Sequence, residues 1–283
     1  MPRGGPASLE DLARAADALD RGQQVQAQLE QALLHGSSIG GARPKAVLVD
    51  GRRALIAKFS STSDPYPVVK AEAAVMALAQ RCGLSVAATE LVSCLGRDVL
   101  LVERFDRGPG PGERRMMVSA LTILGLSEVE ARYATYPDLA DQIRARFRHP
   151  AAALRELFGR IVFNVCVSNT DDHARNHAAF WDGQALELTP AYDLCPQLRS
   201  GGEAAQAMAI GRDGSRRSKL AVCIDAAETY LLARPEAEEI VGRTVAVIEE
   251  SWDDVAQGAR LTRDESRALW RRQILNPFAQ EPA

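Results

Sequence analysis

The sequence has no closely spaced cysteine pair, no long hydrophobic run and no large excess of one charge. Its five cysteines, among 283 residues, are scattered and odd in number, which argues against a zinc ribbon and a secreted disulfide framework. No apolar stretch approaches the roughly 20 residues that a membrane-spanning helix needs, and the N-terminal residues contain no hydrophobic signal-peptide centre. We therefore expect a cytoplasmic protein that does not bind a membrane.

The formal net charge is only −3, so no overall positive field attracts nucleic acid, and we expect no direct, specific DNA binding. Hydrophobic residues make up 46% of the chain and charged residues 25%, as in ordinary globular proteins. A chain of this length is expected to form one large domain or two lobes. One basic segment, 211–219, could still steer an acidic partner or tRNA, although a solvated basic loop is the simpler interpretation.

The first hundred or so residues predict a small lobe of mixed helices and strands. Leucines at helical spacing follow Ser8 and predict one N-terminal helix, weakened at Gly22 and ending at Gly36. Short apolar runs on both sides of Asp50-Gly51 predict a β-hairpin. The next segments predict a helix over 68–82 and two strands over 89–94 and 98–105, joined by a turn at Gly96-Arg97.

Beyond residue 113 the pattern is mainly helical. Pro137 and Pro150 are typical of the first turns of helices. The strand signal returns once, in a hairpin that turns at Asp182-Gly183. A strand-rich lobe followed by a larger helical lobe is the organisation of a bilobal α+β enzyme, which we predict here.

A glycine-rich loop over 36–45 precedes the first hairpin. Gly36 and Gly41 have the spacing of a Walker phosphate-binding loop, but Ala42 and Arg43 stand where that loop requires Lys and then Ser or Thr. A glycine loop between extended segments can instead place its backbone N–H groups over nucleotide phosphates, as in kinases. An ordinary flexible connection fits the composition equally well.

Lys58 lies in the strand that follows this loop. The alternation of a strand can direct its ammonium away from the apolar neighbours and toward the glycine loop. A lysine at this place is typical of the phosphate-binding lysine of kinases, although a solvated strand lysine shows the same pattern. Glu72, in the following helix, could form the ion pair that positions Lys58, or could simply lie on the helix surface.

The segment 169–177 concentrates Asn, Asp, His and Arg directly after an apolar helix. Asp171 precedes Asn176 by five residues, the spacing by which kinase catalytic loops supply a general base and a magnesium ligand. Asp193, after the intervening hairpin, adds a carboxylate for a metal. The order Lys58, Asp171, Asn176, Asp193 is the order of these roles in kinases and is more specific than any single residue.

Two other interpretations of this segment compete. On a helix, His173 and His177 would share one face as in a zinc hydrolase, with Asp171 or Asp172 completing the site. Alternatively, either aspartate could cap a helix. The polar composition favours turns over helix, so we prefer the kinase interpretation.

Together these segments resemble the HipA family of serine/threonine kinases, the toxins of bacterial toxin–antitoxin pairs. Only about 35 residues precede the glycine loop, so the chain resembles the shorter, HipT-type arrangement. Arg175 stands where lysine is common in the family. The positive charge is kept, but the planar guanidinium of arginine replaces the compact ammonium of lysine. The matching segments, from Gly36 to Phe278, are SSIGGARPK, LIAKF, VERFDR, SNTDDHARN, LTPAYDL and ILNPF.

The resemblance implies roles for individual residues. Asp171 would be the catalytic base, and His173 would contact the nucleotide or Asp171, or hold the loop. Ser38, or its neighbour Ser37, would be autophosphorylated, and the added charge would repel ATP and switch the kinase off. Asn176 and Asp193 would hold magnesium, and residues 103–105 would form the adenine hinge. The implied ATP-binding residues are Gly40, Gly41, Ala42, Lys58, Glu103, Phe105, Asn176 and Asp193.

The resemblance also implies a bilobal, protein-kinase-like α+β fold. The expected parts are an N-terminal helical segment over 1–35, a small strand-rich N-lobe over 36–107 and a larger helical C-lobe over 108–283. The implied cofactors are ATP and Mg²⁺, and the implied partners are a cognate antitoxin and a protein substrate, an aminoacyl-tRNA synthetase. The first alternative is a catalytically silent kinase-like binding module, and the less favoured one is a His/Asp metal-dependent hydrolase.

Overall fold

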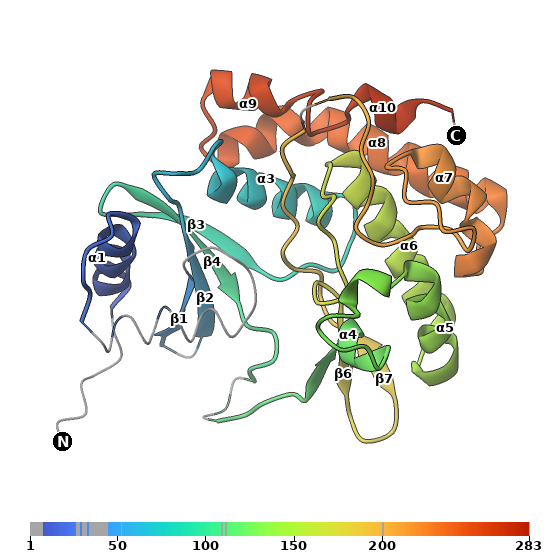
Figure 1. Ribbon diagram of the computed structural model, residues 1–283, viewed down its shortest axis with the longest axis horizontal. Helices are drawn as coiled ribbons and strands as arrows, with labels where there is room; N and C mark the ends of the chain where they lie inside the picture. Colours follow the sequence, from blue (N-terminus) through green and yellow to red (C-terminus); the bar gives the residue numbers. More distant parts are fainter. Residues whose placement is uncertain are drawn as a thin grey trace. The chain divides into compact units, whose positions relative to one another are not determined.

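The computed structural model describes residues 8–26, 29, 33, 45–51, 53–108, 110, 112–199 and 201–282. The chain divides into two compact units, the first made of Met1–Ala73 and Ala87–Arg114 and the second of Ala74–Val86 and Arg115–Ala283. A four-stranded sheet belongs to the first unit, whereas α4 to α10 belong to the second (Figure 1). The expected α+β class is confirmed.

The first unit is built around an antiparallel sheet with the strand order β1-β2-β4-β3. Both expected hairpins are present, one formed by β1 and β2 and the other by β3 and β4. The elements of this part of the chain are α1 (Leu9–Asp20), β1 (Lys45–Asp50), β2 (Arg53–Phe59), α3 (Val68–Arg81, shared between the units), β3 (Thr89–Cys94) and β4 (Arg97–Glu103).

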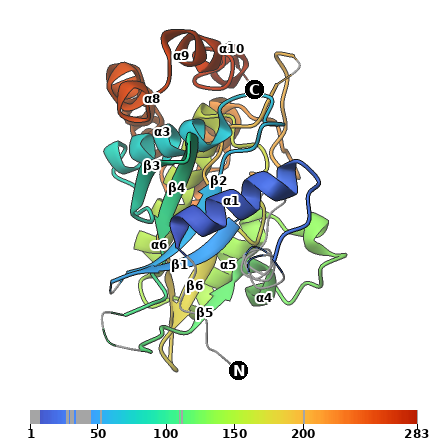
Figure 2. The ribbon, with the colours of Figure 1, turned by 90° about the vertical axis from the view of Figure 1, so that its left-hand side faces the viewer.

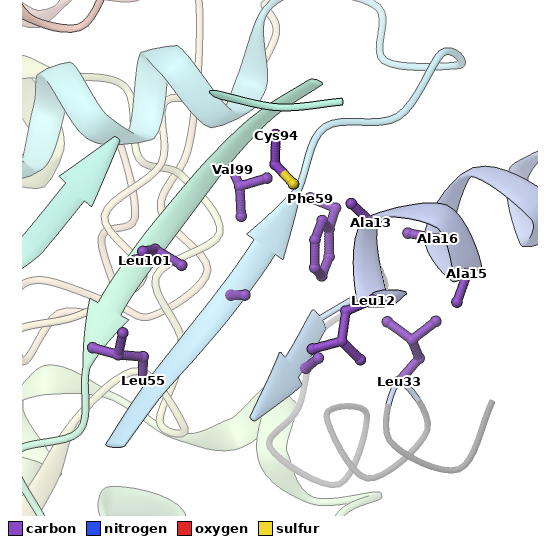
Figure 3. Packing of buried hydrophobic residues seen from close by; sticks show 12 residues of the cluster. Leu12, Ala13, Ala15, Ala16, Leu33, Leu55, Phe59, Cys94, Val99 and Leu101 are labelled. Carbon is purple, nitrogen blue, oxygen red and sulfur yellow. The ribbon is translucent and has the colours of Figure 1, made fainter. Parts of the chain in front are cut away.

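Helix α1 covers one face of this sheet (Figures 1 and 2). Its Leu12 is fully buried and belongs to the same hydrophobic cluster as Leu55 and Phe59 of β2 (Figure 3). Because side chains alternate along a strand, the apolar side chains of β2 that join this cluster leave Lys58 on the opposite face. The helix therefore covers the apolar face of the sheet, and the opposite face carries the candidate lysine.

The N-terminal helix is shorter than the sequence predicted. Helix α1 ends at Asp20, and Gly22 follows with a left-handed φ of +67°. Glycine adopts this conformation without steric cost, which makes it a common helix terminator. The prediction of one helix from Ser8 to Gly36 was therefore wrong, although Leu33 still contributes to the buried cluster.

The turn between β3 and β4 also differs from the prediction by one residue. Cys94 pairs with Arg97, so the two turn residues are Leu95 and Gly96, with φ of 51° and 77°. Two consecutive positive φ values are typical of the tight turn that matches the twist of a hairpin. Leucine is an unusual first residue for this turn, which is why the sequence suggested Gly96-Arg97 instead.

Arg97 connects α1 to the sheet. Its guanidinium donates to Asp20 Oδ2 at 2.8 Å, to the Ser60 carbonyl oxygen at 2.7 Å and also to Asp17. The Arg97 side chain is only 12% exposed. These bonds cross from the helix to the start of β4, so they fix the helix on its face of the sheet.

We predict that Arg97→Ala lowers the unfolding midpoint near neutral pH. The hydrogen bond from Arg97 lowers the pKa of Asp17 in the folded protein, so the pair stabilises the fold above about pH 4 and less as the pH falls through the lowered pKa. Urea denaturation at about pH 7 and about pH 3 should show a variant effect that shrinks in acid. Arg14→Ala, which removes an exposed ion pair on the same helix, is the control and should change the stability little. An equal loss of stability in Arg97→Ala at both pH values would contradict the prediction.

The second unit is mainly helical, with a small antiparallel sheet of strand order β5-β6-β7. The expected hairpin is formed by β6 and β7, but the three-residue β5 was missed because so short a run carries no periodicity. Within the described ranges, no helix is long and apolar enough to cross a membrane. The elements are β5 (Met117–Ser119), α4 (Ala120–Ile123), η1 (Ala131–Tyr133), α5 (Tyr136–Arg146), α6 (Pro150–Cys166), β6 (Ala178–Trp181), β7 (Leu186–Leu188), α7 (Leu220–Asp225), η2 (Ala227–Tyr230), α8 (Arg234–Gly258), α9 (Arg263–Leu269) and α10 (Pro277–Gln280).

Helix α6 is the central helix of the second unit. Proline stands at its start, as predicted, and residues 157–166 are buried without interruption. A helix that is buried on every side must be surrounded by other elements. The polar segment 168–177, which follows its C-terminal end, therefore starts from a fixed position.

Candidate functional site

Lys58 and Glu72 form a buried ion pair in the first unit. Lys58 Nζ lies 2.5 Å from Glu72 Oε1, and the two side chains are only 13% and 5% exposed. Burying both charges is costly unless they are paired, and this geometry provides the pairing. Of the two alternatives for Glu72, the structure shows the ion pair and not the surface position.

A second lysine lies beside this pair and was not singled out from the sequence. Lys45, at the start of β1, is directly opposite Lys58 in the strand register and is also buried. Residues opposite each other in an antiparallel pair have neighbouring side chains. The strand that follows the glycine-rich loop in the sequence therefore begins opposite Lys58.

The predicted phosphate loop itself lies outside the described residues. This applies to every candidate residue between 37 and 42, so their roles stay predictions. They are Ser37, Ser38, Gly40, Gly41 and Ala42.

The predicted adenine hinge follows β4. Glu103 is exposed and its backbone N–H donates to the Ala88 carbonyl oxygen at 2.8 Å. Phe105 follows in a turn and is half-buried. Arg104 forms two hydrogen bonds with Asp106, of 2.9 and 2.7 Å, which fix the direction of the chain as it leaves the sheet.

In the second unit, residues 167–177 form turns and irregular backbone without a helix. The predicted loop is thus present. The one-face arrangement of His173 and His177 that a zinc hydrolase would need is not formed, because it requires a helix. For the same reason, Asp171 and Asp172 do not cap a helix within this segment.

Asp172 is the buried anchor of this loop. Its Oδ2 atom accepts hydrogen bonds from Tyr136 Oη at 2.5 Å, Asn164 Nδ2 at 2.9 Å and His177 Nε2 at 2.7 Å. Tyr136 is fully buried, and burial together with Asp172 raises its pKa well above the usual value, so its hydroxyl stays a donor. One carboxylate thus connects the loop to α5 and α6.

We predict that Asp172→Ala destabilises the protein by about 3–5 kcal/mol, because it leaves three buried donors without their charged acceptor. The neighbouring Asp171 offers a matched control. Asp171→Ala removes an exposed carboxylate and should change the free energy of unfolding by less than about 0.5 kcal/mol. Urea denaturation measures both. Equal effects of the two substitutions would contradict the role given to Asp172.

Asp171, the residue before Asp172, is exposed to solvent. Its side chain is exposed, and its carboxylate makes no hydrogen bond or ion pair with any residue that the structure describes. The backbone around it is held on both sides, by the bond from Ala207 N to the Thr170 carbonyl oxygen at 2.9 Å and by the Asp172 anchor. A carboxylate whose backbone is fixed and which contacts no described residue can accept a proton.

His173 is half-buried and contributes an unsatisfied polar atom. Its Nδ1 atom is buried and has no hydrogen-bond partner in the described chain, and the ring makes no hydrogen bond to Asp171. A buried polar atom without a partner is uncommon in a native structure. The structure shows no contact between His173 and Asp171, and the other two roles, contact with the nucleotide and holding the loop, stay predictions.

A hydrogen bond links the residues that precede Asn176 and Asp193. Tyr192 Oη donates to the Arg175 carbonyl oxygen at 2.6 Å, which joins the segment before Asp193 to the segment before Asn176. Asp193 itself has a left-handed φ of +60°, a conformation that aspartate and asparagine tolerate better than most residues.

Arg160 fixes the start of the segment that ends at Asp193. This buried side chain of α6 donates Nη2 to the Thr189 carbonyl oxygen at 2.8 Å and pairs Nε with Glu156 at 2.9 Å. Sequence reasoning did not find it, because an arginine within an apolar helix carries no spacing signal. Through Thr189, this arginine holds the segment against α6.

The oxygen atoms of this site fit a magnesium ion. Asn176 Oδ1 accepts no hydrogen bond from the described part of the chain, and its Nδ2 reaches only the Asp171 carbonyl oxygen, at 3.5 Å. Mg²⁺ prefers such oxygen ligands and is often bound by one or two side chains together with nucleotide phosphates. The described residues contain no group of three His, Cys, Asp or Glu arranged to hold a metal.

The basic segment 211–219 is largely engaged within the second unit. Arg212 forms two hydrogen bonds with Asp141, of 2.6 and 3.0 Å, and Arg216 donates to the Ala207 carbonyl oxygen at 2.5 Å. Lys219 is buried and lies 3.4 Å from Glu281. These cations are satisfied in place, which weakens the interpretation of the segment as a steering patch.

Comparison with curated proteins identifies relatives of this chain. The Sinorhizobium fredii protein Y4mE is 33% identical over 181 residues, which make up 56% of this chain and 41% of that protein. The serine/threonine-protein kinase toxin HipA of Shewanella oneidensis is 30% identical over 183 residues, 56% of this chain and 42% of that protein. The match thus spans less than half the length of each relative.

Solved structures show the same fold. HipA of Shewanella oneidensis, in its complex with HipB and operator DNA, has a TM-score of 0.72 at 22% identity, covering 96% of this chain and 70% of that chain. The Helicobacter pylori proinflammatory kinase CtkA has a TM-score of 0.55 at 13% identity, covering 85% and 91%. The predicted kinase-like α+β fold, with a small strand-rich lobe and a larger helical lobe, is thereby confirmed. Residues 37–252 match the HipA-like C-terminal domain, and the chain therefore belongs to the HipA family.

Proposed function

We propose that this protein is an ATP-dependent serine/threonine protein kinase. The observation that carries the proposal is the contrast between two neighbouring aspartates. Asp172 is buried and accepts three hydrogen bonds, whereas Asp171 is exposed and its carboxylate contacts no residue that the structure describes. Such a loop holds a general base in position without neutralising it. The buried Lys58–Glu72 pair and membership of the HipA family support the same activity.

In this proposal each residue has one role. Lys58 binds the ATP phosphates and is held by Glu72, while Asp171 orients the substrate hydroxyl and takes its proton. Asn176 and Asp193 hold Mg²⁺, which when bound neutralises charge on the phosphates. His173 contacts the nucleotide, and residues 103–105 hold the adenine. Gly40, Gly41 and Ala42 supply backbone donors over the phosphates.

The biological role is also a proposal. Because the match spans less than half of each curated relative, the toxin activity of HipA is carried over to this chain only as a hypothesis. We propose that it acts in the cytoplasm as the toxin of a type II toxin–antitoxin pair, binds a cognate antitoxin and phosphorylates an aminoacyl-tRNA synthetase. In this scheme the N-lobe extends over 36–107 and the C-lobe over 108–283.

Incubation with labelled ATP and Mg²⁺, alone and with a bacterial lysate, tests the proposal. We expect labelled protein in the lysate, identified by mass spectrometry, and loss of the label in Lys58→Ala. Lys70→Ala removes another half-buried lysine, in α3, and should keep the activity. ATP binding without any transfer by the unaltered protein would overturn the proposal and support a catalytically silent module.

We further predict autophosphorylation in the glycine-rich loop. After incubation with MgATP, mass spectrometry should find phosphate on Ser38, and Ser38→Ala should remove it whereas Ser37→Ala should not. A phosphate carries about −1.5 to −2 charge at pH 7 and repels the γ-phosphate, so the modified protein should bind ATP much more weakly. Unchanged ATP affinity of the phosphorylated protein, measured by calorimetry, would contradict the off-switch.

A further inference from the structure

A cavity of about 340 Å³ lies in the second unit, and its lining includes residues of α10 together with Arg199, Gly201 and Gly202. Its lining includes Arg199, Arg272, Phe278 and Glu281. None of these residues has a role in the proposed transfer reaction. The cavity has the size of a small-ligand pocket.

Two arginines of this cavity contact no acidic side chain among the described residues. Arg199 donates Nη1 to Ser168 Oγ at 3.1 Å and Nη2 to the Gly202 carbonyl oxygen, and its buried Nε has no hydrogen-bond partner in the part of the chain that the structure describes. Arg272 is exposed, and its guanidinium makes no ion pair or hydrogen bond with a described residue. The carboxylate of Glu281 is used by Lys219, at 3.4 Å.

The charge of Arg199 is poorly compensated by its surroundings. Burial lowers the pKa of this arginine, because a desolvated cation without a counter-ion is less stable. The ring of Phe278, whose centroid lies 5.7 Å from Arg199 Cζ, offers only a weak cation–π contact. Elsewhere in the unit, Arg212 and Arg234 each contact carboxylates. The cavity therefore carries two positive charges that an anionic ligand would neutralise.

We propose that this cavity binds a phosphomonoester dianion. Two uncompensated cations match a dianion better than a single carboxylate, and the guanidinium fork fits the geometry of phosphate oxygens. The volume of about 340 Å³ also leaves room for the group that the phosphate esterifies. That group belongs either to a small phosphorylated metabolite or to a phosphorylated side chain of a protein.

Calorimetric titration with inorganic phosphate, glucose 6-phosphate and N-acetyl-O-phosphoserine amide, at constant ionic strength, tests this site. We expect all three to bind and to compete with one another. Loss of one arginine contact should weaken binding about ten-fold, both in Arg272→Gln and in Arg199→Lys. Tighter binding of the phosphoserine probe assigns a phosphorylated side chain, and tighter binding of the sugar phosphate assigns a metabolite.

Two control variants isolate the cavity. Arg263→Gln removes an exposed arginine outside it and should bind like the unaltered protein. Lys58→Ala removes the lysine of the proposed ATP site and should also bind normally. Because Arg199 contacts the buried Ser168, Arg199→Lys could fail to fold, but the exposed Arg272 keeps the test decisive. Unchanged affinity in Arg272→Gln, or loss of binding in Lys58→Ala, would overturn the inference.

Discussion

Asp171→Asn is expected to leave the protein folded and able to bind ATP while lowering the rate of phosphoryl transfer roughly 10²- to 10⁴-fold. The substitution keeps the shape of the side chain and removes its ability to accept a proton. It should cost no stability, because the carboxylate is exposed and makes no hydrogen bond with a described residue. The effect should therefore fall on kcat and not on nucleotide affinity.

Single-turnover kinetics with labelled ATP, together with calorimetric ATP binding, measure the two quantities. Asp253→Asn is the matched control, since it changes an exposed aspartate of α8 that has no interaction in the described chain. Full activity of Asp171→Asn would mean that another group takes the proton. A loss of ATP binding in this variant would show that Asp171 acts on the nucleotide and not on the substrate hydroxyl.

Asp193→Asn should lower transfer by at least a factor of roughly 10², because in the proposed site it removes the negative charge that would hold the metal beside the phosphates. Asparagine is the suitable replacement at this position. The backbone φ of +60° is one that asparagine accepts about as readily as aspartate, so the loss can be attributed to the missing charge. Alanine would add a conformational cost to the chemical one.

The dependence of ATP binding on magnesium separates this effect from misfolding. Without Mg²⁺, calorimetry should give the same ATP affinity for Asp193→Asn and for the unaltered protein. With Mg²⁺, only the unaltered protein should bind more tightly. If the magnesium-dependent gain survives in the variant and transfer continues, Asp193 is not a metal ligand.

Local signals in the sequence were sufficient for much of this architecture. Asp50-Gly51 and Asp182-Gly183 are strong turn dipeptides, and each hairpin turns at or beside its dipeptide: Asp50 still pairs with Arg53, while Asp182 and Gly183 lie between the paired Trp181 and Leu186. Lys58 and Glu72 were linked through the order of kinase roles, and their side chains are in contact. The hairpins depend on residues that are neighbours in the sequence, and the ion pair follows from the known order of functional residues in kinases. Both kinds of signal can be found in a single sequence.

Other features depend on contacts between distant residues and had no such signal. Asp172 looked like a second candidate for catalysis or capping, because nothing in the sequence shows that Tyr136 and Asn164 approach it. Helix α1 was predicted too long for a related reason. Leucines continue at helical spacing beyond Gly22, but the chain turns there and Leu33 reaches the core from a separate segment.

The packing of α1 limits how far this chain can be shortened from its N-terminal side. Leu55 and Phe59 of β2 are shielded by Leu12 and its neighbours on that helix (Figure 3). A fragment starting at β1 would present this apolar surface to water, and exposed apolar patches on sheets promote self-association. Any shortened version meant to stay monomeric must therefore retain the chain from Ser8, whose side chain caps the helix.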